Sequence, residues 1–144
     1  MFRHGLRVSE AVDLRWDQID FKAGTIHVNR LKNGKPATHY LEGDEMRALR
    51  RLRREQTRSP FIFISERGGP LTRSTVNKLI ERAGEKSDFK FPVHPHMLRH
   101  ACGFYLANKG VDTRTIQDYL GHRSIQHTVR YTELTPQKFK GLWS

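Results

Sequence analysis

Hydrophobic and polar positions follow two different periods along this chain. Apolar residues near the start, such as Leu6 and Ala11, recur at helical spacing, and this pattern stops near Trp16. In residues 19–41 apolar positions alternate with polar ones, which is typical of half-buried strands. Three such stretches in succession predict a three-stranded antiparallel meander, with strands near residues 19–21, 26–28 and 37–41.

Two polar segments separate the predicted strands. The first, residues 22–24, ends in glycine and can turn the chain. The second contains Asn33-Gly34, a strong signal for a type I′ hairpin turn, in which both residues adopt positive φ. Lys32 and Lys35 flank this second turn.

The remainder of the chain has a helical pattern. Helices are expected over residues 44–54, 72–84, 95–110 and 112–121, followed by a short helical turn from residue 124 towards residue 131. Thr72 and Asp112 stand at N-cap positions, and Pro95 suits the first turn of its helix. Gly84 and Gly121 are expected to end two of these helices. The elements together predict one α+β domain over residues 1–144, mostly helical with a small antiparallel sheet.

The composition favours a polyanionic partner. Lysine and arginine number 26 against 15 aspartates and glutamates, which gives a formal net charge of +11. No apolar run approaches the roughly 20 residues that span a bilayer, which disfavours a membrane protein. The single cysteine, Cys102, cannot form an internal disulfide. We expect a soluble intracellular protein that binds nucleic acid.

Six residues suited to phosphate chemistry occur in this order at separate places along the chain: Arg7, Lys32, His96, Arg99, His122 and Tyr131. Stabilising charge on a phosphate without a metal requires fixed cations, and arginine suits this role because its planar guanidinium holds two phosphate oxygens and stays charged. Histidine exchanges protons near neutral pH. Tyrosine has a pKa near ~10, so its attack needs a base or local positive charge. Each residue alone would be unremarkable, but together they indicate an active site.

These motifs resemble the signature of the tyrosine recombinase family, also called the phage integrase family. That signature is an arginine, a lysine, a His-x-x-Arg pair, a second histidine and a nucleophilic tyrosine. The resemblance extends from Gly5 to Trp143, and residues 95–103, 116–123 and 127–132 are most similar to the fimbrial phase-variation recombinases. It implies a site-specific DNA recombinase, of integrase or invertase type, that cleaves and rejoins DNA through a 3′-phosphotyrosyl intermediate.

The resemblance also implies a role for each main site residue. Arg7 and Arg99 would hold the phosphate. His96 would be the base for the nucleophile Tyr131. His122 would donate a hydrogen bond to the phosphate.

Further residues would support this chemistry. Lys32 would protonate the departing 5′ oxygen, with Lys35 as the alternative. Glu10, one helical turn after Arg7, would orient that arginine. His100 would support the site without reacting. Ala101 stands where many family members have serine or threonine, so one supporting hydroxyl is absent.

The resemblance extends to partners and domain organisation. It implies double-stranded DNA as the partner, no cofactor or metal, and a bacterial cytoplasmic, nucleoid-associated location. It further implies a homotetramer on DNA, formed through residues 135–144, with Phe139, Leu142 and Trp143 exposed in the monomer. Because the first helical pattern is already under way at the start, we expect a catalytic domain that is truncated at its N-terminus and lacks a DNA-clasping helical domain.

Two other interpretations remain open. His96 and His100 have the i, i+4 spacing of a zinc hydrolase pair, but Met97 occupies the place of the glutamate base. The second alternative is a catalytically silent DNA-binding remnant of a mobile element.

Overall fold

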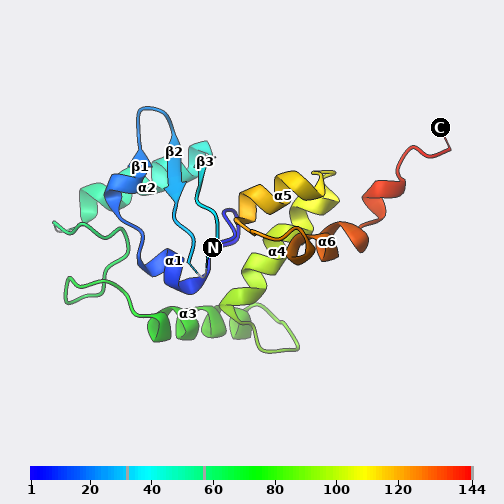
Figure 1. Ribbon diagram of the computed structural model, residues 1–144. Helices are drawn as coiled ribbons and strands as arrows, with labels where there is room; N and C mark the ends of the chain where they lie inside the picture. The colour runs from blue at the N-terminus through cyan, green and yellow to red at the C-terminus, as the bar shows by residue number, and fades with distance from the viewer. Residues whose placement is uncertain (32, 57, 144) are drawn as a thin grey trace.

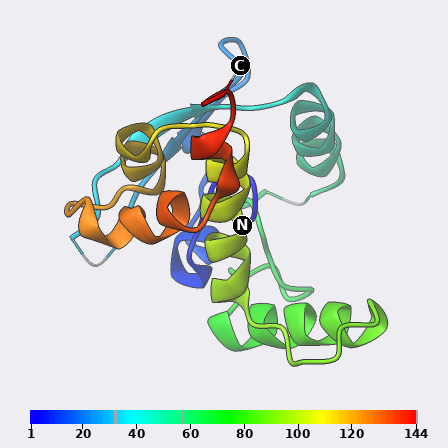
Figure 2. The ribbon, with the colours of Figure 1, turned by 90° about the vertical axis from the view of Figure 1, so that its right-hand side faces the viewer.

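The computed structural model describes residues 1–31, 33–56 and 58–143. Its elements are, in order, α1 (Val8–Val12), a 3₁₀ turn (Trp16–Gln18), β1 (Ile19–Asp20), β2 (Thr25–Val28), β3 (Ala37–Tyr40), α2 (Gly43–Glu55), α3 (Arg73–Lys86), α4 (Pro95–Asn108), α5 (Thr113–Leu120), α6 (Gln126–Glu133) and a second 3₁₀ turn (Pro136–Phe139). The sheet, α1 and α2 form one half of the molecule, and α4, α5 and α6 form the other, as Figure 1 shows. Helix α3 lies below α1 and leads into α4 (Figure 2). The predicted α+β class is confirmed.

The sheet is the predicted antiparallel meander, in the order β1-β2-β3. Ile26 in the central strand pairs with Ile19 of β1 and with His39 of β3. Ile26 and Val28 are buried, while His27 between them is exposed. The alternation that predicted these strands therefore corresponds to one face in the core and one in solvent.

The connection between β2 and β3 differs from the predicted two-residue turn. It covers residues 29–36, and only Asn33 of the pair has a positive φ, of 62°. The type I′ assignment, which needs positive φ at Gly34 as well, was wrong. The reason is a tertiary contact, because the N–H of Lys35 donates to the carbonyl of Gly121 at 2.9 Å and ties this loop to the end of α5.

Two hydrophobic clusters form the core, one in each half. The cluster under the sheet consists of Leu6, Ala11, Leu14, Ile19, Ile26, Val28 and Ile62. The cluster among α4, α5 and α6 consists of Cys102, Ala107, Ile116, Leu120 and Tyr131. Each half thus buries its own apolar side chains, and polar contacts described below join the halves.

The predicted N-caps are present. Thr72 accepts a hydrogen bond from the N–H of Thr75 at 3.1 Å, and Asp112 accepts one from the N–H of Thr115 at 2.9 Å. Gly121 ends α5 with a φ of 76°, a conformation that glycine adopts without a Cβ clash.

Helix boundaries differ from the prediction near two glycines, and α4 ends at Asn108 rather than at residue 110. The first helix begins at Val8 rather than before Leu6, because Gly5 has a φ of 60° and turns the chain. Helix α3 continues past Gly84 to Lys86. Gly84 does not end this helix but allows a close approach, since a Cβ there would lie 2.7 Å from Val93.

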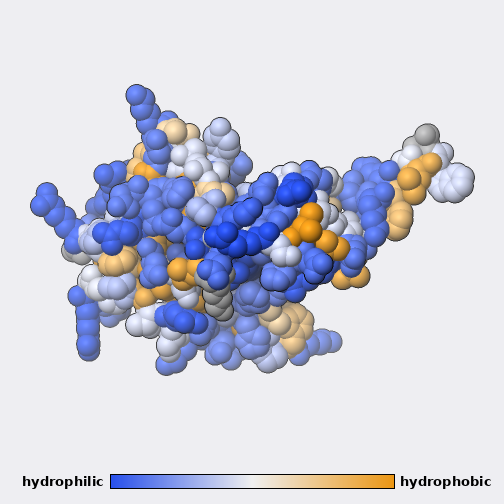
Figure 3. All heavy atoms as spheres, in the orientation of Figure 1, coloured by the Kyte–Doolittle hydropathy of each residue, from blue (hydrophilic) through white to orange (hydrophobic). Residues whose placement is uncertain are grey.

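The surface of the molecule is mostly hydrophilic, and apolar side chains appear in small groups, one of them on the C-terminal segment at the right of Figure 3. Phe139 is 60% exposed, Leu142 65% and Trp143 101%. The predicted exposure of these three side chains is confirmed. Within the described ranges, no helix has the length and apolar character needed to cross a membrane.

Replacing Gly103 with alanine should loosen the packing of α6 on α4. A Cβ at Gly103 would lie 2.7 Å from the ring of Tyr131, and overpacking of this kind costs about 1–3 kcal/mol. We expect urea denaturation to show this loss in the free energy of unfolding. Gly69→Ala is the matched control, because a Cβ there meets nothing within 4 Å. Equal stability of the two variants would contradict the tight packing at Gly103.

Candidate active site

Arg7 stands directly before α1 and is held by Glu10. Its Nη1 donates to Oε2 of Glu10 at 3.0 Å, and its backbone N–H donates to Oε1 at 2.8 Å. Burial alone would raise the pKa of Glu10, but hydrogen bonds from the N–H groups of Arg7 and Leu31 help to hold that pKa below its usual range. Glu10 is therefore ionised at neutral pH and fixes the Arg7 side chain.

Arg30 is a buried cation that the sequence analysis did not identify. Its Nη1 donates to Oε1 of Glu10 at 2.9 Å and to the carbonyl of Gly5 at 3.0 Å. Its Nη2 donates to the carbonyls of His4 at 2.8 Å and Tyr119 at 2.9 Å. Burial lowers the pKa of Arg30, and Glu10 opposes this shift. Arg30 thus joins the sheet half, through Glu10, to the end of α5.

Arg99 of α4 lies beside Arg30 and is only 2% exposed. Its Nη1 donates to the carbonyl of Gly5, and its Nη2 donates to that of Leu120 at 3.0 Å. Burial, followed by the charges of Arg7 and Arg30, lowers the pKa of Arg99 to about 10, which leaves it charged at neutral pH. Two arginines therefore share the Gly5 carbonyl, at the left-handed turn before α1.

His122 follows α5 and is buried against Thr128 of α6. Its Nδ1 lies 2.7 Å from Oγ1 of Thr128. Burial, followed by the charge of Arg99, lowers the pKa of His122 to about 4, so the ring is neutral at neutral pH. When Thr128 donates to Nδ1, the neutral ring carries its proton on Nε2 and can donate it to an anion.

Tyr131 of α6 is fully buried, with 0% exposure. Its ring packs edge-on against Phe104 with the ring centroids 4.9 Å apart, and the guanidinium of Arg130 lies over it at 5.1 Å from the centroid. The Tyr131 hydroxyl lies 2.9 Å from Nδ1 of His100. The histidine in contact with this hydroxyl is therefore His100, which the sequence analysis had taken as a supporting residue.

His96, in the first turn of α4, is exposed and lies against His100. The two rings meet edge to face, with their centroids 4.4 Å apart and their planes at 86°. His96 and Arg7 line a cavity of about 570 Å³ that Arg73 and His94 also border. The structure thus brings two of the predicted site residues to one open cavity.

Lys32, the first candidate for the acid, lies outside the described residues. Lys35 is exposed. Besides the Lys35 contact with Gly121, the side chain of Arg123 donates to the carbonyl of Asn33. The hairpin loop therefore rests on the segment that carries His122.

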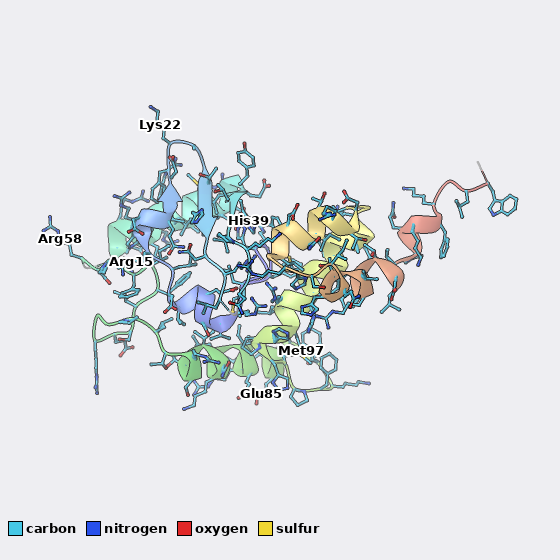
Figure 4. All side chains as sticks on the ribbon, in the orientation of Figure 1. Arg15, Lys22, His39, Arg58, Glu85 and Met97 are labelled. Atoms are coloured by element: carbon cyan, nitrogen blue, oxygen red, sulfur yellow. The ribbon has the colours of Figure 1, made fainter. Side chains whose placement is uncertain are left out.

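A second polar network joins α2, β3 and α5. The His39 ring, labelled in Figure 4, stacks on Tyr119 with the ring centroids 3.8 Å apart. Nδ1 of His39 lies 3.0 Å from Nδ1 of His4, whose Nε2 lies 2.7 Å from a carboxylate oxygen of Glu45. Burial, followed by the charge of His4, lowers the pKa of His39 to about 4. The position of these groups, between the two halves, indicates a structural role.

The zinc interpretation gains no support from the geometry. Within residues 1–31, 33–56 and 58–143, no group of three or more His, Cys, Asp or Glu side chains could hold a metal ion. Nδ1 of His100 is already hydrogen-bonded to the Tyr131 hydroxyl.

Comparisons with known proteins identify the class of protein to which this fold and site belong. Residues 1–138 match the phage integrase family, and the chain belongs to that family. It is a site-specific tyrosine recombinase by this membership, as its motifs indicated.

Its relatives include the type 1 fimbriae regulatory protein FimE of Escherichia coli K12. FimE is 47% identical over an alignment of 148 residues, which covers 99% of this chain and 75% of FimE. Tyrosine recombinase XerD of Mycobacterium tuberculosis is 34% identical, over 100% of this chain and 49% of XerD. The crystal structure of XerA recombinase superposes with a TM-score of 0.81 at 27% identity, covering 99% of this chain and 53% of XerA. The chain thus spans about half the length of XerD and XerA.

Proposed function

We propose that this chain cleaves and rejoins DNA through a covalent bond between Tyr131 and the 3′ phosphate. The observation that carries the proposal is the proximity of the charged groups to the tyrosine. Arg99 donates to the carbonyl of Gly5, two residues before Arg7, and to that of Leu120, two residues before His122. The hydroxyl of Tyr131 is hydrogen-bonded to His100, the residue after Arg99. A phosphate among these groups would meet two cations, one hydrogen-bond donor and one nucleophile.

In the proposed reaction, the Tyr131 oxygen attacks phosphorus and the bond to the 5′ oxygen breaks. Arg7 and Arg99 stabilise the negative charge that spreads over the phosphate oxygens. His122 donates a hydrogen bond to one of them. One ring of the contacting pair His96 and His100 accepts the phenol proton. Protonation of the departing 5′ oxygen is assigned to the hairpin lysine, Lys32 or Lys35.

DNA as the substrate is supported by charge and by related structures. The net charge of +11 suits a polyanion. XerH recombinase, 24% identical, has been solved bound to its difH substrate, and a lambda integrase dimer, 26% identical, bound to a COC′ core site. The cavity bordered by Arg7, Arg73 and His96 offers the cations and proton donors that a phosphate backbone would contact.

A nicked DNA substrate tests the proposal. After cleavage, the short piece between the cleavage site and the nick, which carries the free 5′ hydroxyl, diffuses away. Religation is then impossible, so the protein stays covalently attached to the 3′ phosphate and gives a slower band on a denaturing gel. We expect this adduct in the presence of EDTA, because the assigned groups are all side chains. Absence of an adduct on any recombination site that the chain binds would favour the silent DNA-binding remnant. Loss of the adduct in EDTA, with recovery on adding zinc or magnesium, would favour metal catalysis.

We also propose that the C-terminal segment forms contacts between protomers in a tetramer on DNA. Burying a large apolar side chain contributes roughly 1.5–3 kcal/mol, and Phe139, Leu142 and Trp143 are all exposed. Replacing the three with serine should leave the melting temperature unchanged but weaken assembly on DNA in sedimentation experiments. Tyr40→Ser, at a site 80% exposed on β3, is the control and should change neither. If the triple variant were strongly destabilised without DNA, the three side chains would be stabilising their own domain, and the proposal would be wrong.

A further inference from the structure

The Tyr131 hydroxyl is held between two helices by one specific contact. Tyr131 lies on α6 and His100 on α4, and the contact between Oη and Nδ1 is 2.9 Å long. Tyr131 has no exposed surface, so water does not satisfy its O–H in this state. The hydrogen bond to His100 therefore determines where the reactive oxygen lies.

The burial of the Tyr131 hydroxyl sets the direction of this hydrogen bond. Its O–H needs an acceptor, and Nδ1 of His100 is the acceptor in contact with it when the ring carries its own proton on Nε2. His100 is then a neutral ring with Nδ1 as the acceptor. This is the arrangement in which a base lies within reach of the proton that it removes.

His96 has a different environment. It is exposed, it borders the cavity with Arg7, and its ring meets that of His100 edge to face. We propose that His100 accepts the proton of Tyr131 as its oxygen attacks the phosphate, and that His96 contacts the phosphate instead. This inference rests on the proposed function, and it replaces the base that the family resemblance implied.

The groups that face His100 favour its neutral form. Burial lowers its pKa, and the positive charges of Arg130 on α6 and of His96 and Arg99 on α4 lower it further. A ring kept neutral in this way is able to accept a proton at neutral pH. The exposed Arg130 also covers the Tyr131 ring, and an incoming phosphate would draw this guanidinium away.

The step balances without an additional reactant. The bond from Oη of Tyr131 to phosphorus forms, and the bond from phosphorus to the 5′ oxygen breaks with its electron pair on that oxygen. The phenol proton moves to Nδ1 of His100, which becomes an imidazolium. The proton for the 5′ oxygen comes from the separate acid assigned above. In religation the imidazolium returns its proton to Oη.

Cleavage of a substrate with sulfur in place of the bridging 5′ oxygen isolates the proton-accepting step, because a thiolate leaves without protonation. We expect His100→Asn to cleave ~10²–10⁴-fold more slowly than wild type. Asparagine accepts a hydrogen bond but does not take a proton at neutral pH. The rate of this variant should keep rising with pH, because hydroxide has to remove the phenol proton, instead of levelling off once the histidine is unprotonated. His96→Asn should lower the rate without changing the shape of this profile. A pH profile that changes shape in His96→Asn but keeps its shape in His100→Asn would overturn the proposal.

A measurement without DNA tests the pairing itself. Accepting a hydrogen bond stabilises the neutral ring, so removing the donor should raise the pKa of the ring that accepts it. In NMR titrations, Tyr131→Phe should raise the pKa of His100, while Tyr105→Phe, an exposed change on α4, should leave it in place. An unchanged or lowered pKa of His100 in Tyr131→Phe would overturn the inference even if the adduct forms. A missing adduct in wild type, with the His100 shift present, would count against the proposed function alone.

Discussion

A chain with Tyr131→Phe should form no covalent adduct with nicked DNA, while its affinity for DNA should be nearly unchanged. The substitution removes the attacking oxygen and keeps the ring that packs against Phe104. The lost hydrogen bond to His100 costs about 0.5–1.5 kcal/mol, which leaves the domain folded. Denaturing gels report the adduct, and fluorescence anisotropy reports binding.

The matched control for this prediction is Tyr40→Phe. Tyr40 is 80% exposed at the end of β3 and should keep full adduct formation when its hydroxyl is removed. An adduct in the Tyr131→Phe variant would identify another residue as the nucleophile. Loss of the adduct in both variants would point to an indirect effect on DNA binding.

Replacing Glu10 with alanine should lower the free energy of unfolding by about 3–5 kcal/mol, because it leaves a buried arginine without its counter-ion. Glu10 accepts hydrogen bonds from Arg7, from Leu31 and from the fully buried side chain of Arg30. This loss is a large part of the 5–15 kcal/mol that stabilises a typical domain. Urea denaturation of the DNA-free chain measures it.

Two further variants make the Glu10 result interpretable. Glu85→Ala, an exposed change on α3 that Figure 4 labels, should have little effect. Adding Arg30→Met to Glu10→Ala should recover part of the lost stability, since the unpaired charge is then removed as well. A mild effect of Glu10→Ala alone would mean that water reaches Arg30.

Much of the fold was predictable because the signals are local. The alternation of residues 19–41 and the capping side chains of Thr72 and Asp112 depend on nearby residues, and the corresponding elements formed. The errors occurred where a distant segment decides the conformation. The hairpin loop is held by Gly121, and Gly84 accommodates Val93 rather than ending its helix.

The site residues likewise divide into those that the sequence predicts and those that depend on distant contacts. The reactive residues were identifiable because arginine, histidine and tyrosine in this order are characteristic of one chemistry. Arg30 gave no comparable signal, because its partners Gly5 and Tyr119 are 25 and 89 residues away along the chain. Thr128 is one of many threonines in the sequence, and only its position beside His122 distinguishes it. The contact between His100 and Tyr131 likewise depends on how α4 packs against α6.

The junction between the two halves has a consequence for how such chains diverge. Arg30 reaches across it to the main-chain oxygen of Tyr119, and Arg99 reaches across it to that of Gly5. Every residue supplies a carbonyl, so a change of side chain at Tyr119 leaves that acceptor in place. Gly5 has to remain glycine, because a Cβ there would clash with the side chain of Leu120. The sheet half of one relative should therefore be exchangeable with the helical half of another, and hybrid chains joined within residues 87–92 should fold with both arginines bound as they are here.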